Sequence, residues 1–366
     1  MAACSHTGCG ALLSQPGSFH MNFRGPFRKF LRERDLRHAL EGELALFSAW
    51  WPARGSRSDP PPTDLMEQRR GIIEFMRPGA CNILSDKKRL ALYLEEFGLT
   101  HWAPLTLTHP LEPLRHGSDA SFDDERLWFL KHVREDCGRG VNVHWGLNAC
   151  RDAWLAMPPS EHENYVAQQG VPRLLLDDDN RKMTVRMYVL LGFARSVDDG
   201  RGSAWSFLHH ICVSRSHPLP YDPSDPDVDR HVTSVSWLHG RVLPHVGHDA
   251  LTQVPRCKEM FAELTRPVLK RWLASEFRSP EGAGQVSFDL LGADVLVDCN
   301  LRPWLIEFNQ LPDLHLIGDS TLRAARASIV NDVFKKVLDN TVAAGCVHAS
   351  TEGCEAWEPL CVERSA

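Results

Sequence analysis

The sequence lacks several features that would assign it at once to a common class of protein. No run of about 18 or more apolar residues occurs in the 366-residue chain, so we expect no membrane insertion. The first residues contain neither a basic region nor a sustained apolar run, so we expect no secretory signal. With 41 basic and 47 acidic residues, the net charge of −6 argues against a general nucleic-acid binder. The pattern G-x-x-x-x-G-K-[ST] of a P-loop is also missing.

The 11 cysteines and 18 histidines do not have the spacing of a metal site. Neither a Cys-x-x-Cys pair nor a His-x-x-x-His pair occurs in the sequence. The odd number of cysteines and the length of the chain also argue against a small secreted domain held by disulfides. We therefore interpret the cysteines as reduced thiols and expect a cytoplasmic protein.

The composition is that of a globular protein, with 43% hydrophobic and 24% charged residues, and the length suggests two or three domains. Basic residues are concentrated in residues 24–37, which form either a solvated helix face or a contact for an acidic partner. Proline-rich loops are expected at residues 54–62 and 217–229. The chain after Cys346 is expected to be weakly ordered.

Apolar runs and their periodicity predict a mixture of strands and helices. The expected strands are Trp128–Leu130, Leu174–Leu176, Val185–Leu191 and Ile211–Val213. The expected helices are Lys87–Phe97, Cys257–Phe277 and Leu322–Val342. Because strands and helices do not alternate regularly, an α+β fold is favoured over a doubly wound sheet.

Two strand-like runs flank the turn-like segment Cys299–Arg302. In an antiparallel hairpin with this four-residue loop, Asp298 faces Pro303 and Asp294 faces Glu307. One face of such a hairpin is apolar and is the expected core, formed by Val295, Val297, Trp304, Ile306 and Phe308.

Side chains that carry oxygen gather on the opposite face of this hairpin. Strand alternation places Asn309 on the face that carries Asp294 and Glu307. Oxygen ligands of this kind suit Mg²⁺, which takes one or two carboxylates and leaves positions for phosphate oxygens. The sequence therefore predicts a magnesium site here, and a pair of exposed carboxylates at a sheet edge is the alternative.

Two further segments have features of phosphate binding. Lys131 ends an apolar strand and can reach phosphates as a point charge. The following Gly138-Arg139-Gly140 is either a loop whose backbone N–H groups approach phosphates or a plain turn. Lys182 and Arg186 share one face if their segment is extended, which indicates an anionic ligand, with solvated charges as the alternative.

In this order the motifs resemble the tubulin–tyrosine ligase-like family. W-F-L-K…G-R-G-V is followed by L-L-L…R-K-x-x-x-R-x-Y-V-L and by F-x-L-x-G-x-D-x-L-x-D…L-x-P-W-L-I-E-x-N. The resemblance covers roughly residues 70–340 and implies an ATP-grasp fold, in which two α+β domains clasp ATP. We expect four parts: an N-terminal domain with the basic segment (1–75), a central ATP-grasp domain (76–178), a C-terminal ATP-grasp domain with the metal site (179–345) and a tail (346–366).

The resemblance also implies which residues form the site. Residues implied for ATP are Lys88, for which the adjacent Lys87 is the alternative match, Lys131, Gly138, Arg139, Gly140, Gln168 at the adenine, and Lys182. Residues implied for Mg²⁺ are Asp294, Glu307 and Asn309. Arg186 and Arg215 are implied to face the γ-phosphate and the acceptor carboxylate, and Thr184, His231 and Thr233 to lie in the substrate region.

The implied activity is that of an ATP-dependent carboxylate–amine ligase that works through an acyl phosphate. The implied acceptor is an acidic C-terminal tail of tubulin, and tyrosine, glutamate and glycine all stay open as the added amino acid. Such a protein is expected at the cytoskeleton or in cilia. Thr184 and Ser234 depart from the family pattern, which has an acid and an asparagine at these positions. The alternatives are therefore a weak or inactive tubulin- or microtubule-binding member and an ATP-grasp ligase with another substrate.

Overall fold

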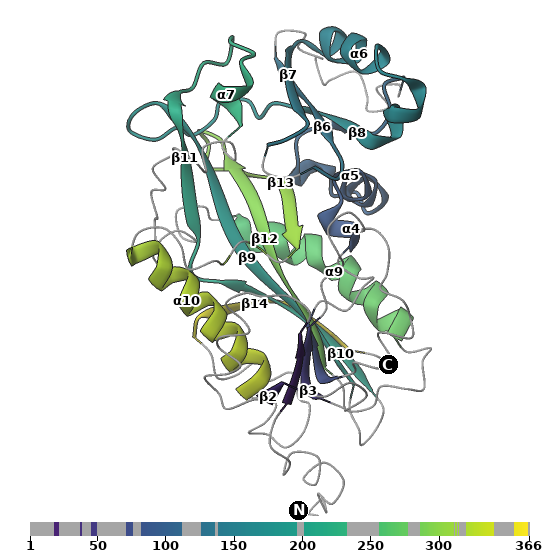
Figure 1. The fold of residues 1–366 in the computed structure, drawn as a ribbon, viewed down its shortest axis with the longest axis vertical. Helices are drawn as coiled ribbons and strands as arrows, with labels where there is room; N and C mark the ends of the chain where they lie inside the picture. The colour runs from purple at the N-terminus through teal and green to yellow at the C-terminus, as the bar shows by residue number, and fades with distance from the viewer. Residues whose placement is uncertain are drawn as a thin grey trace, which may run out of the picture.

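The chain is α+β, as predicted, and contains two sheets (Figure 1). The structure is a computed structural model that describes residues 18–21, 37–38, 45–49, 71–75, 82–111, 126–135, 138–195, 201–232, 256–276, 286–310, 312, 314, 320–339 and 355–364. The basic segment, apart from Arg37, and the predicted loop at 54–62 lie outside the described residues.

The larger sheet has ten strands in the described part of the chain, in the order β14-β10-β9-β12-β4-β3-β1-β2, with β11 paired to β9 and β13 paired to β12. Its strands are β1 (Ser18–Met21), β2 (Arg37–His38), β3 (Ala45–Ala49), β4 (Gly71–Phe75), β9 (Arg181–Arg195), β10 (Gly202–His209), β11 (Val213–Pro220), β12 (Val286–Val297), β13 (Pro303–Gln310) and β14 (Trp357–Arg364).

The smaller sheet has the order β5-β8-β6-β7 and lies with α6 at the top of Figure 1. Its strands are β5 (Thr106–Leu107), β6 (Leu127–His132), β7 (Val141–Trp145) and β8 (Tyr165–Gln169). The helical segments are α4 (Asn82–Ser85), α5 (Lys87–Glu96), η1 (Thr100–Trp102), α6 (Leu147–Leu155), η2 (Pro159–Asn164), α7 (Val228–His231), α9 (Cys257–Glu276), α10 (Ser320–Phe334) and the π-helical η4 (Lys335–Asp339).

Strands β9 and β12 are the centre of the larger sheet, with α9 and α10 on its two sides (Figure 1). Met187 and Ala293 belong to the apolar core that the sheet forms with Phe261 and other residues of α9. Because side chains alternate along a strand, Arg186 and Asp294 face the other side, toward α10. The fold therefore separates an apolar α9 face from an α10 face that carries charged residues.

The helix predictions are confirmed in the described residues. Helix α5 begins after Asp86, whose side chain caps the helix, and is followed by Gly98 with φ +66°. Helix α9 spans the predicted range from Cys257, and α10 begins two residues before the predicted Leu322. None of the helices in the described ranges is both long enough and apolar enough to cross a membrane.

Two strand predictions are wrong. Residues 174–176 make only isolated bridges, from Leu174 to Asp298 and from Leu176 to Lys182. The strand predicted at residues 211–213 begins only at Val213, and continues as β11 into the segment predicted to be a loop. Within the described chain β11 pairs on one side only, with β9, and such an edge tolerates prolines that lack an N–H donor.

The expectation of a weakly ordered tail is also wrong for residues 357–364. This segment is β14, which pairs antiparallel with β10 at the edge of the larger sheet. Its first residue, Trp357, packs edge-on against His209 and donates its indole N–H to the carbonyl oxygen of Asp332 in α10. The end of β14 therefore joins β10 to α10.

Candidate active site

Strands β12 and β13 form the predicted hairpin, and Asp294 lies opposite Glu307 as expected. The predicted register at the turn is wrong, because Pro303 faces Val297 and not Asp298. The carboxylate of Asp298 instead accepts backbone N–H bonds within the turn. The register at Asp294 and the register at Pro303 differ by one residue, because the hairpin has an irregularity between the turn and Asp294.

This irregularity is a β-bulge, in which Ile306 is the extra residue of β13. It shifts the alternation of β13, so that Leu305 enters the core in place of Trp304 and Ile306, which we expected there. Asn309 stays on the side of the carboxylates. Its amide donates to Asp294 Oδ2 at 3.2 Å and to Glu307 Oε1 at 3.4 Å. The three predicted metal ligands are therefore together.

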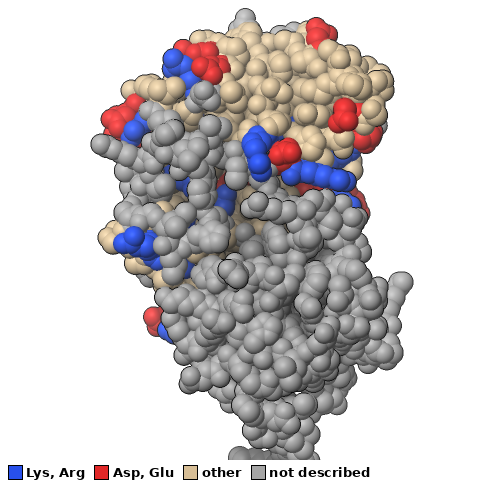
Figure 2. Space-filling model, in the orientation of Figure 1, with Lys and Arg blue, Asp and Glu red and all other residues tan. Residues whose placement is uncertain are grey.

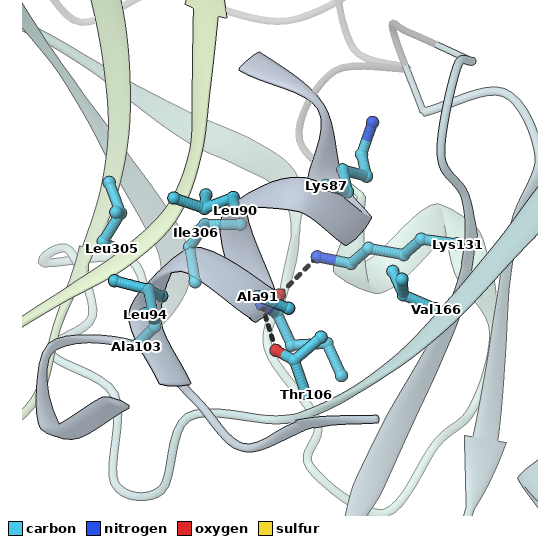
Figure 3. Close-up of a pocket in the computed structure, with 11 residues that line it drawn as sticks. Lys87, Leu90, Ala91, Leu94, Ala103, Thr106, Lys131, Val166, Leu305 and Ile306 are labelled. Atoms are coloured by element: carbon cyan, nitrogen blue, oxygen red, sulfur yellow. Dashed lines mark hydrogen bonds between the residues drawn. The ribbon is translucent and has the colours of Figure 1, made fainter. Parts of the chain in front are cut away.

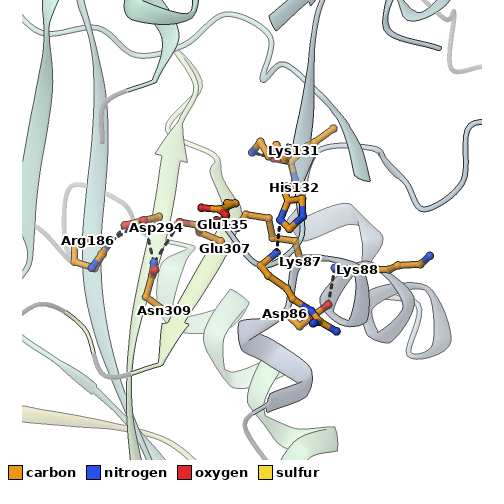
Figure 4. A network of polar contacts seen from close by, with 12 residues as sticks. Asp86, Lys87, Lys88, Lys131, His132, Glu135, Arg186, Asp294, Glu307 and Asn309 are labelled. Atoms are coloured by element: carbon orange, nitrogen blue, oxygen red, sulfur yellow. Dashed lines mark hydrogen bonds and ion pairs between the residues drawn. The ribbon is translucent and has the colours of Figure 1, made fainter. Parts of the chain in front are cut away.

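Arg186 of β9 makes a two-pronged ion pair with Asp294 (Figure 4). The two residues are opposite each other in the ladder, with Arg186 Nε 2.5 Å from Oδ1 and Nη2 2.8 Å from Oδ2. Burial alone would lower the pKa of the Arg186 guanidinium, but the charge of Asp294 holds it above its ordinary value. Arg186 is therefore a fixed positive charge at the centre of the site.

Helix α5 contributes Lys87, and not the expected Lys88, to the site (Figure 4). The Lys87 Nζ lies 3.4 Å from Glu307 Oε2 and donates to the backbone carbonyl of Glu135 at 3.0 Å. Lys88 pairs with Glu163 instead. Because successive helical residues point about 100° apart, only one of two adjacent lysines can face the hairpin.

The charges around Glu307 keep it ionised. Burial alone would raise its pKa, but Lys87, Lys131 and Arg186 lower it, so that the pKa is about 2. Glu307 is therefore a carboxylate at any physiological pH, as a metal ligand must be.

Lys131 of β6 and Gln168 of β8 lie side by side in the smaller sheet. Lys131 Nζ donates to Gln168 Oε1 at 2.6 Å, and the Gln168 amide donates to Thr106 Oγ1 at 3.1 Å. Burial is the main reason that the pKa of Lys131 is lowered to about 8, although Glu307 opposes this shift. A nearby anion would restore the charge of Lys131.

A small pocket lies between the two sheets and α5 (Figure 3). Its polar lining is Lys87, Thr106, Lys131 and Gln168. Its apolar lining is Leu90, Ala91, Leu94, Ala103, Val166, Leu305 and Ile306. Apolar walls with a few polar groups are typical of a site for a small organic molecule.

Lys182 lies on the same face of β9 as Arg186 and is buried. Its Nζ donates to the backbone carbonyl of His231 at 2.8 Å and lies 5.1 Å from the centre of the Phe129 ring. Burial, and then the charge of Lys131, lower its pKa to about 7. The predicted residue His231 thus lies beside Lys182, whereas Thr233 lies outside the described residues.

Arg215 of β11 is opposite Thr184 of β9, two residues from Arg186 on the same face. Burial, followed by the charge of Arg186, lowers the pKa of Arg215. Two carboxylates thus lie among a larger number of cationic side chains, namely Lys87, Lys131, Arg186 and Arg215, and Lys182 lies beside Lys131. On the face seen in Figure 2, blue Lys and Arg atoms lie beside red acidic atoms below a mostly uncharged upper end. The excess of positive charge suits a polyanionic ligand.

The Gly138–Gly140 segment is part of the connection from β6 to β7. Gly138 and Gly140 have φ of +73° and +64°, which only glycine adopts easily. The exposed Arg139 forms an ion pair with Glu135 at 3.5 Å. None of these three residues is among those that line the pocket in the described chain.

The donor set suits magnesium better than a soft transition metal. In the ranges that the structure describes, no group of three or more His, Cys, Asp or Glu side chains is gathered to hold a metal. Asp294, Glu307 and Asn309 supply two carboxylates and one amide on adjacent strands, which are hard oxygen ligands. These residues therefore fit Mg²⁺ bound together with phosphate oxygens.

Comparisons with known proteins find similarity to one family of enzymes over part of the chain. The model of the tubulin-tyrosine ligase family matches residues 249–349, which include all three of these ligands. Human tubulin polyglutamylase TTLL5 is 25% identical over 265 residues, or 66% of this chain and 19% of the relative. Tubulin glycylase 3B of Tetrahymena thermophila is 28% identical over 89 residues (24% and 8%), and mouse probable tubulin polyglutamylase TTLL2 is 43% identical over 53 residues (14% and 10%).

Over part of its length the chain is similar to the tubulin–tyrosine ligase-like family. It covers about a fifth of the length of human TTLL5 and about a tenth of that of mouse TTLL2. The relatives that it matches are named as tubulin-modifying enzymes.

Proposed function

We propose that the chain is an ATP-dependent carboxylate–amine ligase of the ATP-grasp type, which adds an amino acid to a protein acceptor. The proposal is carried by one observation: two carboxylates and several buried cations meet beside an apolar pocket where two sheets approach each other. A nucleoside triphosphate with Mg²⁺ has the complementary parts, since it combines an apolar base, a polyanion and a cation. Tubulin is the proposed acceptor, because the relatives are named for it.

The proposed nucleotide site combines the pocket with the lysines around it. Gln168 and the apolar lining would hold the adenine, and Lys131 and Lys182 the phosphates. Lys87 replaces Lys88 in this proposal because it lies beside Glu307. The smaller sheet lies within the proposed central domain, residues 76–178, and β9 to β13 within the proposed C-terminal domain, residues 179–345.

Mg²⁺ would be held by Asp294, Glu307 and Asn309, and when bound it would neutralise charge between phosphate groups. The γ-phosphoryl group would pass from ATP to an acceptor carboxylate, giving ADP and an acyl phosphate. The amine would then attack the acyl carbon, form the C–N bond, expel phosphate and lose a proton. Arg186 and Arg215 would stabilise the negative charge that develops on the transferred group and the carboxylate.

The test is incorporation of labelled tyrosine, glutamate and glycine into tubulin and into a cell lysate, with Mg²⁺ and with or without ATP. ATP-dependent incorporation of one amino acid, with one ADP formed for each bond, supports the proposal. Labelling of lysate proteins but not of tubulin would assign another acceptor. Absence of ATP binding in the same preparation would refute the ligase assignment.

An inactive tubulin-binding member is a second candidate, and it is favoured by the pairing of Arg186 with Asp294. Both carboxylate oxygens of Asp294 accept a bond from the guanidinium, which competes with a metal for this carboxylate. On β9, Thr184 occupies the position two residues away on the same face and offers no second acid. Binding of tubulin without nucleotide turnover would support this candidate.

A further inference from the structure

Helix α10 carries a buried arginine within its apolar stripe. The face of α10 toward the sheet includes Leu322, Ile329, Val330 and Val333, each at most 3% exposed. Arg326 precedes Ile329 and Val330 by three and four residues, so it belongs to the same stripe, and it is only 4% exposed. Burying a guanidinium there costs free energy that an apolar residue would not cost.

The contacts of α10 show where along the sheet its residues lie. Lys336, just after α10, lies 4.3 Å from the centre of the Phe207 ring on β10. One turn earlier, Asp332 bonds to His209, two residues farther along β10. Because β10 and β9 are antiparallel, the N-terminal half of α10 runs along β9 toward Arg186.

Arg326 therefore lies at the same level along the sheet as Arg186 on β9 and Arg215 on β11. It precedes Asp332 by six residues, or about 9 Å of helix, which equals about three residues of a strand. Counted along the sheet, this distance leads from the level of His209 on β10 to about the level of Arg186 on the paired strand β9. Arg215 lies on β11, which pairs with this part of β9.

The electrostatics agree with this position. Burial and Arg186 lower the pKa of Arg215, and the charge of Arg326 lowers it further. Burial raises the pKa of the Tyr188 hydroxyl, and the charges of Arg186, Arg215 and Arg326 all oppose that rise. The charges of three guanidinium groups thus act on one buried hydroxyl on the α10 face.

We infer that Arg326 is a further substrate-binding residue, which holds the carboxylate of the incoming amino acid beside Arg215; this inference rests on the proposed ligase function. The ligase reaction brings two carboxylates to one place, that of the acceptor and that of the amino acid. Arg186 is bonded to Asp294, and the proposed role of Arg215 is to hold the acceptor carboxylate. Arg326 approaches from α10 and binds the second carboxylate.

The test compares Arg326→Met with Arg323→Met, which changes an exposed arginine on the same helix. The KM for the amino acid that the wild type incorporates, among glutamate, glycine and tyrosine, is measured together with the Kd for Mg·ATP. Arg326→Met should raise the amino-acid KM about 10- to 100-fold, as expected for one lost charge-assisted contact, and leave the Kd for ATP unchanged. Arg323→Met should change neither value.

Arg326→Lys keeps the charge and covers the case in which the methionine variant does not fold. It should raise the amino-acid KM several-fold, because lysine cannot grip a carboxylate with two parallel bonds. An unchanged amino-acid KM in Arg326→Lys or in folded Arg326→Met overturns the inference but leaves the ligase function intact. An equal loss of ATP affinity overturns it as well, since Arg326 would then belong to the phosphate site. Failure of the wild type to bind Mg·ATP would instead refute the proposed function.

Discussion

The affinity for ATP should fall as the pH rises from 7 to about 8.5, because two lysines of the proposed phosphate site lose their protons in this range. Burial lowers the pKa of Lys182 to about 7 and that of Lys131 to about 8, from an ordinary value of 10.5. A bound polyanion favours the charged form of both, so that binding takes up protons. The phosphates titrate near pH 6 and contribute little above pH 7.

The magnitude follows from the charged fractions. For Lys182 the fraction falls from about 0.5 to about 0.03 over this range, a factor of about 16. For Lys131 it falls from about 0.9 to about 0.24, a factor of about 4. If both lysines must be charged, the affinity for ATP falls at most about 60-fold.

The stability of the unliganded protein should change in the opposite direction. Both pKa values lie below those of unfolded lysine, so the unfolded chain binds more protons between pH 7 and about 8.5. The free energy of unfolding therefore rises with pH, by at most about 1.4 kcal/mol per pH unit for each lysine.

Isothermal titration with a non-hydrolysable ATP analogue and Mg²⁺, together with denaturant unfolding, tests both directions. Lys182→Arg is the matched control, because arginine keeps its charge throughout this range. It should reduce the loss of affinity to the share of Lys131, about 4-fold. A constant affinity in the wild type, or the same loss in Lys182→Arg, would refute the role of Lys182.

Three further changes test the site residue by residue. Lys131→Ala should weaken ATP binding about 10- to 100-fold in titrations. It should leave the Tm of the unliganded protein nearly unchanged, because removal of a buried charge offsets the lost bond to Gln168. A large drop in Tm with intact ATP affinity would show that the role of Lys131 is structural. Arg215→Lys should keep ATP binding and slow ligation by on the order of 10²-fold, whereas ligation at the wild-type rate would remove Arg215 from the site. Thr184→Asp adds a carboxylate that competes with Asp294 for Arg186, so the metal site should bind a divalent cation more tightly. Mn²⁺, which replaces Mg²⁺ in this experiment, is titrated and its binding is followed by electron paramagnetic resonance. Weaker binding of Mn²⁺ would contradict this competition.

The hairpin with its metal ligands could be predicted because its alternation of apolar and polar residues is regular. Asp294 and Glu307 are opposite each other as expected. The bulge at Ile306 could not be foreseen, because the sequence contains no glycine or proline there to mark it. The predicted hairpin, which has a four-residue loop and no bulge, pairs Asp294 with Glu307 just as the observed hairpin does. This pairing was therefore predicted correctly, although the predicted register at Pro303 was wrong.

The resemblance favoured Lys88 over Lys87, but the helical periodicity of the sequence favours Lys87. Lys87, Leu90, Ala91 and Leu94 have the spacing of one helical face, and all of them line the pocket. Strand β14 was harder to predict, because Pro359 and a short apolar pattern are weak indications of a strand, and its pairing with the edge of β10 is a long-range contact. Arg326 was missed because its burial depends on where α10 packs.

The central claim is that Asp294, Glu307 and Asn309 form a magnesium site that binds ATP together with the cations around it. Its most direct test is calorimetry of a non-hydrolysable ATP analogue, with and without Mg²⁺, on the wild type and on Glu307→Gln. The wild type should bind the analogue much more tightly with Mg²⁺, and Glu307→Gln should lose that difference because a charged ligand of the metal is gone. An equal gain from Mg²⁺ in Glu307→Gln would contradict the magnesium site.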